Sequence, residues 1–450
     1  MSSGHAPSPL DPTHAPQSGP KHPFRNRAVL IGLGALLLLL AITPFLPKGG
    51  NDEGSLEQAG NRPRPANATG YGAISTQMQA EIDRVVGEGE AQGEINARTA
   101  AKMLPADLVA RTTRCADFEG LRYCLGTGWT SQTQAQVQAR TTIAAREIAA
   151  RGKGQPETTG DLDPLAEAAR VAAAPAEQRA AQDRAELTQA ARSVAKVWLL
   201  RHEILGERLP KGFLDRHPEA RETAGARLAA GTTSPSVSPS ATTTAAVTAT
   251  ATPTTITKTK PDYPLRDKVL KNDQVAEQET TYWCGPTSMQ MIAWGWKQVD
   301  KGQAHWADRI GTTRSGSSIT DIVSVINRHT GWDKPEYAGP YVTLDISDFT
   351  YDEWMLLIMR HITDYRAPVL LHPVLRKEYY PYLDDDASGH FQVGRGYRQR
   401  EGKTEKLGYF EPWNQQRFDP SEPFIERVQW RNAYKSYRAN LAHFQHNIGV

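Results

Sequence analysis

Cys284 stands at the start of a segment whose residue types suit nucleophilic catalysis. Gly285 and Pro286 follow it, and residues 289–294 are mostly apolar. Proline favours the first turn of a helix, so the segment predicts a helix that begins at the cysteine. Because the amide groups at a helix N-terminus favour a thiolate, we expect Cys284 to have a lowered pKa and to act as a nucleophile. The alternative is a buried, inert thiol.

A thiolate that attacks a carbonyl group needs an oxyanion donor and a base, and both residue types are present. Gln278 lies six residues before the cysteine, so its amide can donate a hydrogen bond to an oxyanion beside the sulfur. His390 opens a predicted strand over residues 390–397 and is the candidate general base. The next predicted strand ends in Glu411. Because adjacent antiparallel strands lie about 4.8 Å apart, this acid can orient the histidine.

Other residues could take the same roles. Asn414 and Asp419 follow Glu411 and are alternative partners for the histidine. His372 ends another predicted strand and is the alternative base, although no acid-terminated strand is placed for it. No metal or other cofactor is expected: the acidic run at 384–386 lacks the alternating spacing of a calcium loop.

Taken in order, these motifs resemble those of a known peptidase family. Gln278, the block at 284–288, the Gly-His-Phe at 389–391 and a strand that closes on an acid and a proline are similar to the double-glycine leader peptidases that process bacteriocins. The resemblance covers about residues 272–414. It implies a papain-like fold, with a helical lobe led by the cysteine helix and an antiparallel sheet.

The resemblance also implies roles for individual residues. Cys284 corresponds to the nucleophile, His390 to the general base and Gln278 to the oxyanion donor. The family usually has an aspartate where this chain has Glu411, which is one methylene longer. A poorly held imidazole would give a slow or inactive enzyme.

The N-terminal part of the chain predicts a membrane anchor. Residues 1–27 read as a disordered cytoplasmic tail, and residues 28–46 form an uncharged apolar run of the length that crosses a bilayer. Basic residues gather before this run, so we expect the N-terminus to be cytoplasmic and the rest of the chain to lie outside the cell. A cleaved signal peptide is the alternative.

The exported chain divides by composition. Residues 47–72 form a polar spacer, and residues 73–215 form an Ala-rich, mainly α-helical region with helices expected at 131–150 and 176–205. Cys115 and Cys124 fall in a short non-helical insert of this region and are positioned to pair in an oxidising compartment. We find no catalytic constellation in the region. A Thr/Ser/Pro-rich linker at 216–260 separates it from the candidate catalytic domain at 261–450.

These features favour one function over others. The 52 basic and 50 acidic residues nearly balance, which argues against a nucleic-acid-binding protein. We expect an α+β protein that is membrane-anchored, faces outward and hydrolyses peptide bonds in a peptide or protein substrate. A papain-like amidase or endopeptidase that cuts peptidoglycan, and an inactive papain-like binding module, are the alternatives.

Overall fold

The computed structural model describes residues 72–150, 159–161, 163–220, 258–332, 339–400, 402–413 and 415–450. The tail at 1–27 and the membrane segment at 28–46 lie outside these residues, as do most of the spacer and of the linker. Within the described ranges, no helix combines the length and apolar character that a bilayer crossing requires.

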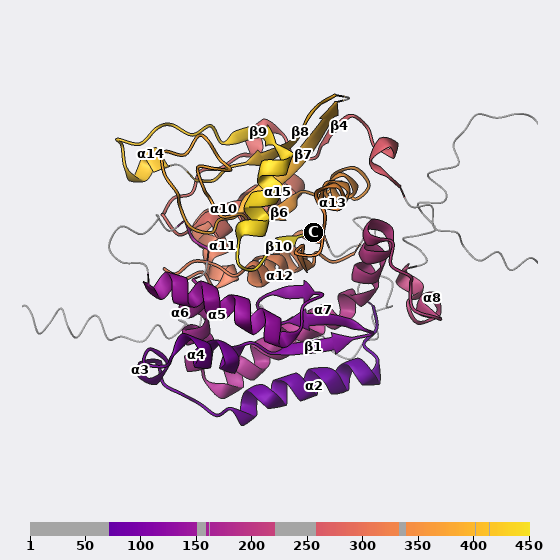
Figure 1. The fold of residues 1–450 in the computed structure, drawn as a ribbon, viewed down its shortest axis with the longest axis vertical. Coiled ribbons are helices and arrows are strands. Elements are labelled where there is room, and N and C mark those ends of the chain that lie inside the picture. Colours follow the sequence, from indigo (N-terminus) through magenta and orange to yellow (C-terminus); the bar gives the residue numbers. More distant parts are fainter. Residues whose placement is uncertain are drawn as a thin grey trace, which may run out of the picture. The chain divides into compact units, whose positions relative to one another are not determined.

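A ten-stranded, mostly antiparallel sheet runs through the described part of the chain (Figure 1). The strands lie in the order β1-β2-β3-β5-β10-β6-β7-β8-β9, and β4 pairs with β7. Their bounds are β1 Cys115–Phe118, β2 Leu121–Cys124, β3 Gly128–Thr130, β4 Arg266–Lys268, β5 Thr343–Asp345, β6 Val369–Leu371, β7 Gln392–Arg400, β8 Lys403–Phe410, β9 Val428–Asn432 and β10 Asn447–Gly449.

Helices flank this sheet (Figure 1). The N-terminal region supplies α2 Thr76–Ala91, α3 Ala97–Ala100, α4 Pro105–Thr112, α5 Gln134–Ala150, α6 Pro164–Ala173, α7 Ala176–Leu205 and α8 Phe213–Arg216. The C-terminal region supplies α10 Cys284–Lys297, α11 Gln303–Ile310, α12 Ile319–Thr330, α13 Tyr351–Thr363, α14 Gln415–Phe418 and α15 Ala433–Ala442. The two long helices expected before residue 210 are confirmed as α5 and α7.

The non-helical insert of the N-terminal region is a small β-structure. β1 and β2 form a hairpin in which Cys115 pairs with Cys124, and these two residues form the expected disulfide. β3 then runs parallel to β5, with Trp129 opposite Leu344. The insert therefore extends the C-terminal sheet, a connection that the sequence did not indicate.

Two apolar clusters hold the described elements together. The larger one joins side chains of α2, α7 and the β1–β3 insert to those of α13, α15 and the sheet, and Phe118, Trp129 and Trp354 are almost fully buried in it. Full burial of side chains of this kind contributes about 1.5–3 kcal/mol each. The second cluster surrounds α10 and α12 and contains Cys284 and Phe391. The mixed α+β class is thus confirmed.

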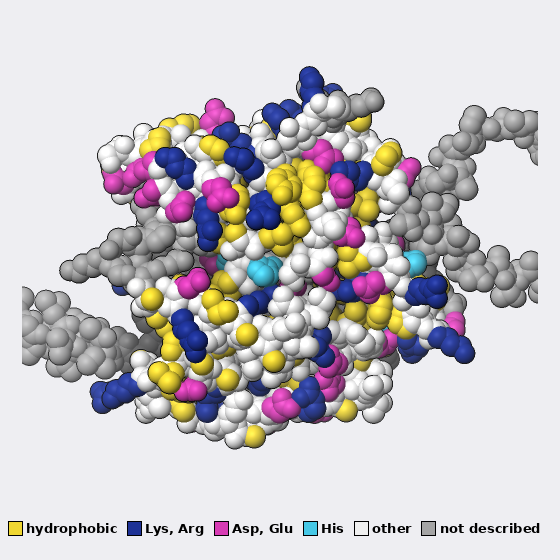
Figure 2. All heavy atoms as spheres, viewed as in Figure 1, with side chains coloured by type: hydrophobic (Ala, Val, Ile, Leu, Met, Phe, Trp, Pro, Cys, Tyr) yellow, Lys and Arg dark blue, Asp and Glu magenta, His cyan; other side chains and the backbone are white. Residues whose placement is uncertain are grey.

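Charged side chains are mixed on the surface. Figure 2 shows basic and acidic side chains interspersed over the visible face, which agrees with the balanced composition of the chain. This face offers no dense basic stripe among the described residues, the feature that binding to a nucleic-acid backbone usually requires.

Candidate active site

The helix predicted at Cys284 is α10, and it begins at that residue. The carbonyl oxygen of Trp283 accepts hydrogen bonds from both the backbone and the side chain of Thr287, which closes the first turn. Gly285 is required at the next position, because a Cβ atom there would lie 2.6 Å from the Ser317 hydroxyl oxygen. The sequence around the cysteine thus allows α10 to pack closely against the segment that leads into α12.

The Cys284 thiol is fully buried, and its pKa is raised well above its ordinary value. Burial is the main cause, because it disfavours the charged thiolate. The amides of Phe391 and Gly285 donate to the sulfur and act in the opposite direction, while the carboxylates of Asp161 and Glu411 raise the pKa further. The expectation of a lowered pKa is therefore wrong for this arrangement, in which burial outweighs the helix N-terminus.

His390 and Glu411 lie together as predicted. β7 and β8 are antiparallel neighbours, with Val393 opposite Phe410, so the start of one strand meets the end of the other. His390 Nε2 lies 2.6 Å from Glu411 Oε1, and both side chains are fully buried. Among the described residues, His390 Nδ1 has no hydrogen-bond partner. That nitrogen is therefore available to exchange a proton.

The Glu411 carboxylate is held in place from several sides. Besides His390, it accepts hydrogen bonds from the Tyr382 hydroxyl (2.8 Å), the Gln392 side-chain amide (2.6 Å) and the Trp413 backbone amide (3.0 Å). The longer glutamate side chain thus folds back towards its own chain. Of the two alternative partners, Asn414 lies outside the described residues, and Asp419 is exposed and binds Ser421.

Gln278 is buried next to the strand end that carries Glu411. Its backbone N–H donates to the carbonyl oxygen of Pro412 at 3.0 Å. Its side-chain amide donates to the Thr280 carbonyl oxygen at 2.8 Å and reaches the Thr159 carbonyl oxygen at 3.5 Å. The amide nitrogen is thus engaged by carbonyl groups of the chain itself, and an oxyanion would have to replace that of Thr280 as its acceptor.

His372, the alternative base, belongs to a different cluster. Its Nε2 lies 2.8 Å from Asp161 Oδ1, and its Nδ1 lies 2.7 Å from Asn447 Oδ1. The other carboxylate oxygen of Asp161 lies 2.6 Å from His443 Nε2. Both ring nitrogens of His372 are thus occupied, and the structure brings His390, not His372, to an acid at a strand end.

Asp161 and His443 are not among the site residues predicted from the sequence. Asp161 lies in the loop between α5 and α6, 211 positions before His372, in a region where we found no catalytic constellation. Nothing in the local sequence distinguishes it from an ordinary loop acid. An isolated parallel bridge with Ser317 places Asp161 beside the segment that leads into α12.

The Asp161, His372 and His443 side chains are close enough to hold a metal ion. Their hydrogen bonds argue against this use. The Gln445 backbone N–H donates to His443 Nδ1 at 3.1 Å, so the proton of the neutral ring lies on Nε2 and points at Asp161. A ligating nitrogen would need that position free. Burial also lowers the pKa of His443 to about 4, which keeps the ring neutral.

The pKa of Asp161 is held well below its ordinary value. Burial alone would raise it, but the neighbouring His372 and His443 outweigh burial. The Asn447 amide donates to the Thr127 carbonyl oxygen, so its own oxygen faces His372 and accepts a proton from Nδ1. Asp161 is therefore an ionised carboxylate whose two oxygens each face a histidine ring nitrogen.

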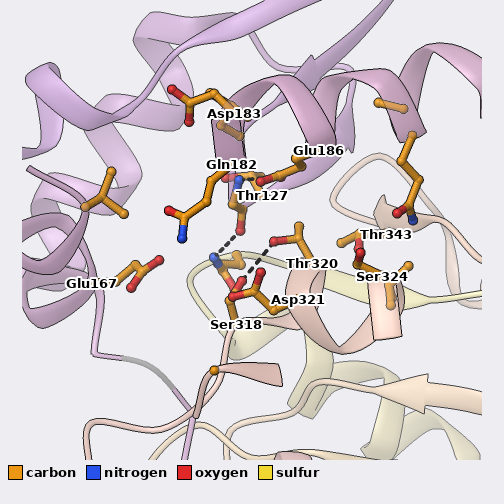
Figure 3. Close-up of a pocket in the computed structure, with 18 of the residues that line it drawn as sticks. Thr127, Glu167, Gln182, Asp183, Glu186, Ser318, Thr320, Asp321, Ser324 and Thr343 are labelled. Carbon is orange, nitrogen blue, oxygen red and sulfur yellow. Dashed lines mark hydrogen bonds between the residues drawn. The ribbon is translucent and has the colours of Figure 1, made fainter. Parts of the chain in front are cut away.

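A separate cavity of about 430 Å³ is lined by residues of α6, α7 and α12 and has Asp161 among its lining residues. Figure 3 shows some of the side chains that line it. Its labelled acids are Glu167, Asp183 and Glu186 from the N-terminal region and Asp321 from α12. The described residues that line it include neither cysteine nor histidine. We therefore place the candidate active site at Cys284 and not in this cavity.

Comparison with known proteins agrees with the motifs in the C-terminal region. The model of the Peptidase_C39 like family matches residues 271–439, which contain Gln278, Cys284, His390 and Glu411. No curated protein and no solved structure matches the chain.

Proposed function

Because the chain carries a Peptidase_C39-like domain at residues 271–439, we propose that it is a cysteine peptidase with Cys284 as its nucleophile. In this proposal His390 is the general base, Glu411 orients it and Gln278 donates to the oxyanion. The observation that carries the assignment is the buried contact of 2.6 Å between His390 Nε2 and Glu411 Oε1, which leaves Nδ1 as the reactive nitrogen.

The reaction follows from this arrangement. Nδ1 of His390 takes the proton from the Cys284 thiol, and the thiolate attacks the carbonyl carbon of the peptide bond. The oxyanion that forms is stabilised by the Gln278 amide and the Cys284 backbone N–H. His390 then gives its proton to the leaving amine, which yields a thioester. Water, deprotonated by the same nitrogen, releases the acid and restores the thiol.

Phe391 supports the pairing of base and nucleophile. Its backbone N–H donates to the Cys284 sulfur, and it directly follows His390 in the chain. The hydrogen bonds on Glu411 hold the carboxylate that contacts Nε2 of His390, so the ring cannot turn that nitrogen towards the sulfur without losing this contact. In this proposal, the support compensates for Glu411, which stands where the family that the chain resembles usually has an aspartate.

The same proposal includes a papain-like arrangement and a place outside the cell, with the chain anchored through residues 28–46. The uncharged apolar run and the basic residues before it support this orientation. The disulfide between Cys115 and Cys124 is consistent with an oxidising compartment. The substrate would be a peptide or protein that reaches the outer face of the membrane.

A screen of the full chain against a peptide library tests the proposal. The wild type should cleave a subset of peptides, and the Cys284→Ala variant should cleave none of them while keeping its melting temperature. Equal cleavage by both proteins would contradict the nucleophile. Purified peptidoglycan should be tested in parallel, since release of wall fragments would identify an amidase or endopeptidase of the cell wall instead.

A further inference from the structure

Three residues from the N-terminal region, 159–161, lie against the candidate active site. Thr159 donates its backbone N–H to the Ser388 hydroxyl at 3.1 Å and its hydroxyl to the Gly389 carbonyl oxygen. On the other side, the Gly160 carbonyl oxygen accepts a hydrogen bond from the Ser317 backbone N–H at 2.9 Å. The segment is therefore held along its backbone by residues on both sides, as an extended peptide ligand is held.

Each of the three residues lies close to a proposed catalytic residue or to the backbone just before Cys284. The Thr159 carbonyl oxygen lies 3.5 Å from the Gln278 side-chain nitrogen, the proposed oxyanion donor. Gly160 packs against the backbone of Tyr282, so tightly that a Cβ atom there would lie 2.4 Å from the carbonyl carbon. The carboxylate of Asp161 is near enough to Cys284 to disfavour its thiolate.

Within the described residues, the four proposed catalytic side chains are closed off from solvent. The side chains of Gln278, Cys284, His390 and Glu411 all have 0% exposure, and Thr159 is equally buried. A peptide substrate must touch the Cys284 sulfur and the Gln278 amide at once. It therefore needs the space that residues 159–161 fill.

We propose that residues 159–161 are an internal, substrate-like inhibitor of the peptidase, and that His372 and His443 form a subsite for an acidic side chain, which Asp161 fills. The inference rests on the proposed function, because it assumes that peptides bind beside Cys284. It names the class of substrate as peptides with an acidic residue at the position that Asp161 now occupies.

The geometry fits a bound inhibitor better than a substrate whose peptide bond is about to be cleaved. The Gln278 amide is 2.8 Å from the Thr280 carbonyl oxygen but 3.5 Å from that of Thr159, so its main hydrogen bond does not go to the segment. The carboxylate of Asp161 also adds negative charge near the sulfur, which opposes formation of a thiolate. The segment both fills the site and weakens the nucleophile.

The alkylation rate of Cys284 tests the proposal without requiring turnover. Cys115 and Cys124 form a disulfide, so iodoacetamide reports on Cys284 in the folded protein. Asp161→Asn in the full chain should react at least tenfold faster than the wild type at neutral pH. The matched control is Asp163→Asn, which changes only the cap of α6 and should stay within twofold. Equal rates for the wild type and Asp161→Asn would overturn the inhibitor.

A second variant guards against a folding defect. Gly160→Ala places a methyl group against the Tyr282 backbone and should expel the segment while leaving the histidines intact, again with at least tenfold faster alkylation. If both variants lose cooperative thermal unfolding, the segment is a structural tie and the proposal fails.

The subsite is tested with a peptide of the sequence Glu-Thr-Thr-Gly-Asp-Leu, which copies residues 157–162. Added to the Asp161→Asn variant, it should slow alkylation at least fivefold. The same peptide with asparagine in place of aspartate should not. Equal protection by both peptides, or by neither, would overturn the acidic subsite.

The outcomes separate the two proposals. Faster alkylation of Asp161→Asn without cleavage of any peptide would support the covering of Cys284 by residues 159–161 but contradict the peptidase, and with it the role of the segment as an inhibitor. Peptide cleavage by the wild type at the rate of Asp161→Asn, with equal alkylation, would support the peptidase and contradict the inhibitor.

Discussion

His390 Nε2 and Glu411 Oε1 are 2.6 Å apart in a fully buried contact between the start of β7 and the end of β8. A hydrogen bond of this length fixes the orientation of the ring. In the proposed mechanism, the chemistry at Cys284 depends on an acid that does not touch the substrate.

Replacing Glu411 should separate orientation from packing. Glu411→Gln keeps the shape but removes the charge, and we expect kcat/KM to fall about a hundredfold or more. Glu411→Asp keeps the charge but shortens the reach, and we expect a smaller loss, about tenfold. Steady-state cleavage of a peptide found in the library screen measures both. Asp419→Asn is the matched control, because that exposed acid binds only Ser421 among the described groups. Unchanged kinetics in Glu411→Gln would remove Glu411 from the mechanism.

Gln278→Ala removes the proposed oxyanion donor. Loss of one such donor lowers kcat by about 10²–10³-fold, and KM should change little because the interaction strengthens only in the transition state. Gln274→Ala is a suitable control, since that glutamine binds the Gly295 carbonyl oxygen away from the site. A large rise in KM with unchanged kcat would instead make Gln278 a substrate-binding residue.

Glu186, at the separate cavity, should make stability depend on pH. Burial raises its pKa to about 8, and the nearby Asp321 adds to this. An unfolded glutamate has a pKa of about 4.3, so the folded protein binds this proton more tightly. The resulting contribution to stability is present below about pH 4 and is lost as the pH rises towards 8.

Glu186→Gln has no such proton to lose and keeps an oxygen that can accept from Tyr123 and Gly126. We expect its free energy of unfolding to exceed that of the wild type by more than about 1 kcal/mol at pH 9, and by less at pH 5. Urea unfolding at the two pH values measures this. Glu177→Gln, at an exposed site on the same helix, should show no pH-dependent difference. A constant difference across pH would contradict the raised pKa.

The disulfide in the β1–β2 hairpin should stabilise the whole sheet. Replacing both Cys115 and Cys124 with serine should lower the free energy of unfolding by about 2–4 kcal/mol, because Phe118 and Trp129 belong to the larger core. A reducing agent should lower the melting temperature of the wild type but not that of the double variant. If the wild type is insensitive to reduction and the double variant is as stable as the wild type, the disulfide contributes nothing to global stability.

The sequence predicted the elements that carry the chemistry because their signals are local. A cysteine before glycine and proline predicts a helix start, and α10 begins there. A histidine at one strand start and an acid at the next strand end predict a contact between antiparallel neighbours, and β7 and β8 make it. Each of these inferences relates residues that are only about twenty positions apart in the chain, or fewer.

The features that the sequence did not predict depend on contacts between distant parts of the chain. Asp161 meets His443 across 282 positions, and no spacing rule links a loop acid to a histidine so far away. The strands of the N-terminal insert have only three or four residues each, too few to show a period of two. The raised pKa of Cys284 also depends on distant parts of the chain. The effect of a helix N-terminus can be read from the local sequence, but burial by residues far away in the sequence cannot.

The position of β10 has a consequence for how the protein is made. This strand, Asn447–Gly449, lies between β5 and β6 and follows every other described strand in the chain. The sheet that joins the N-terminal insert to the catalytic strands therefore cannot be completed until residue 449 has left the ribosome. Until then β5, which pairs with β3 of the insert, and β6, which pairs with β7, lack the strand that joins them.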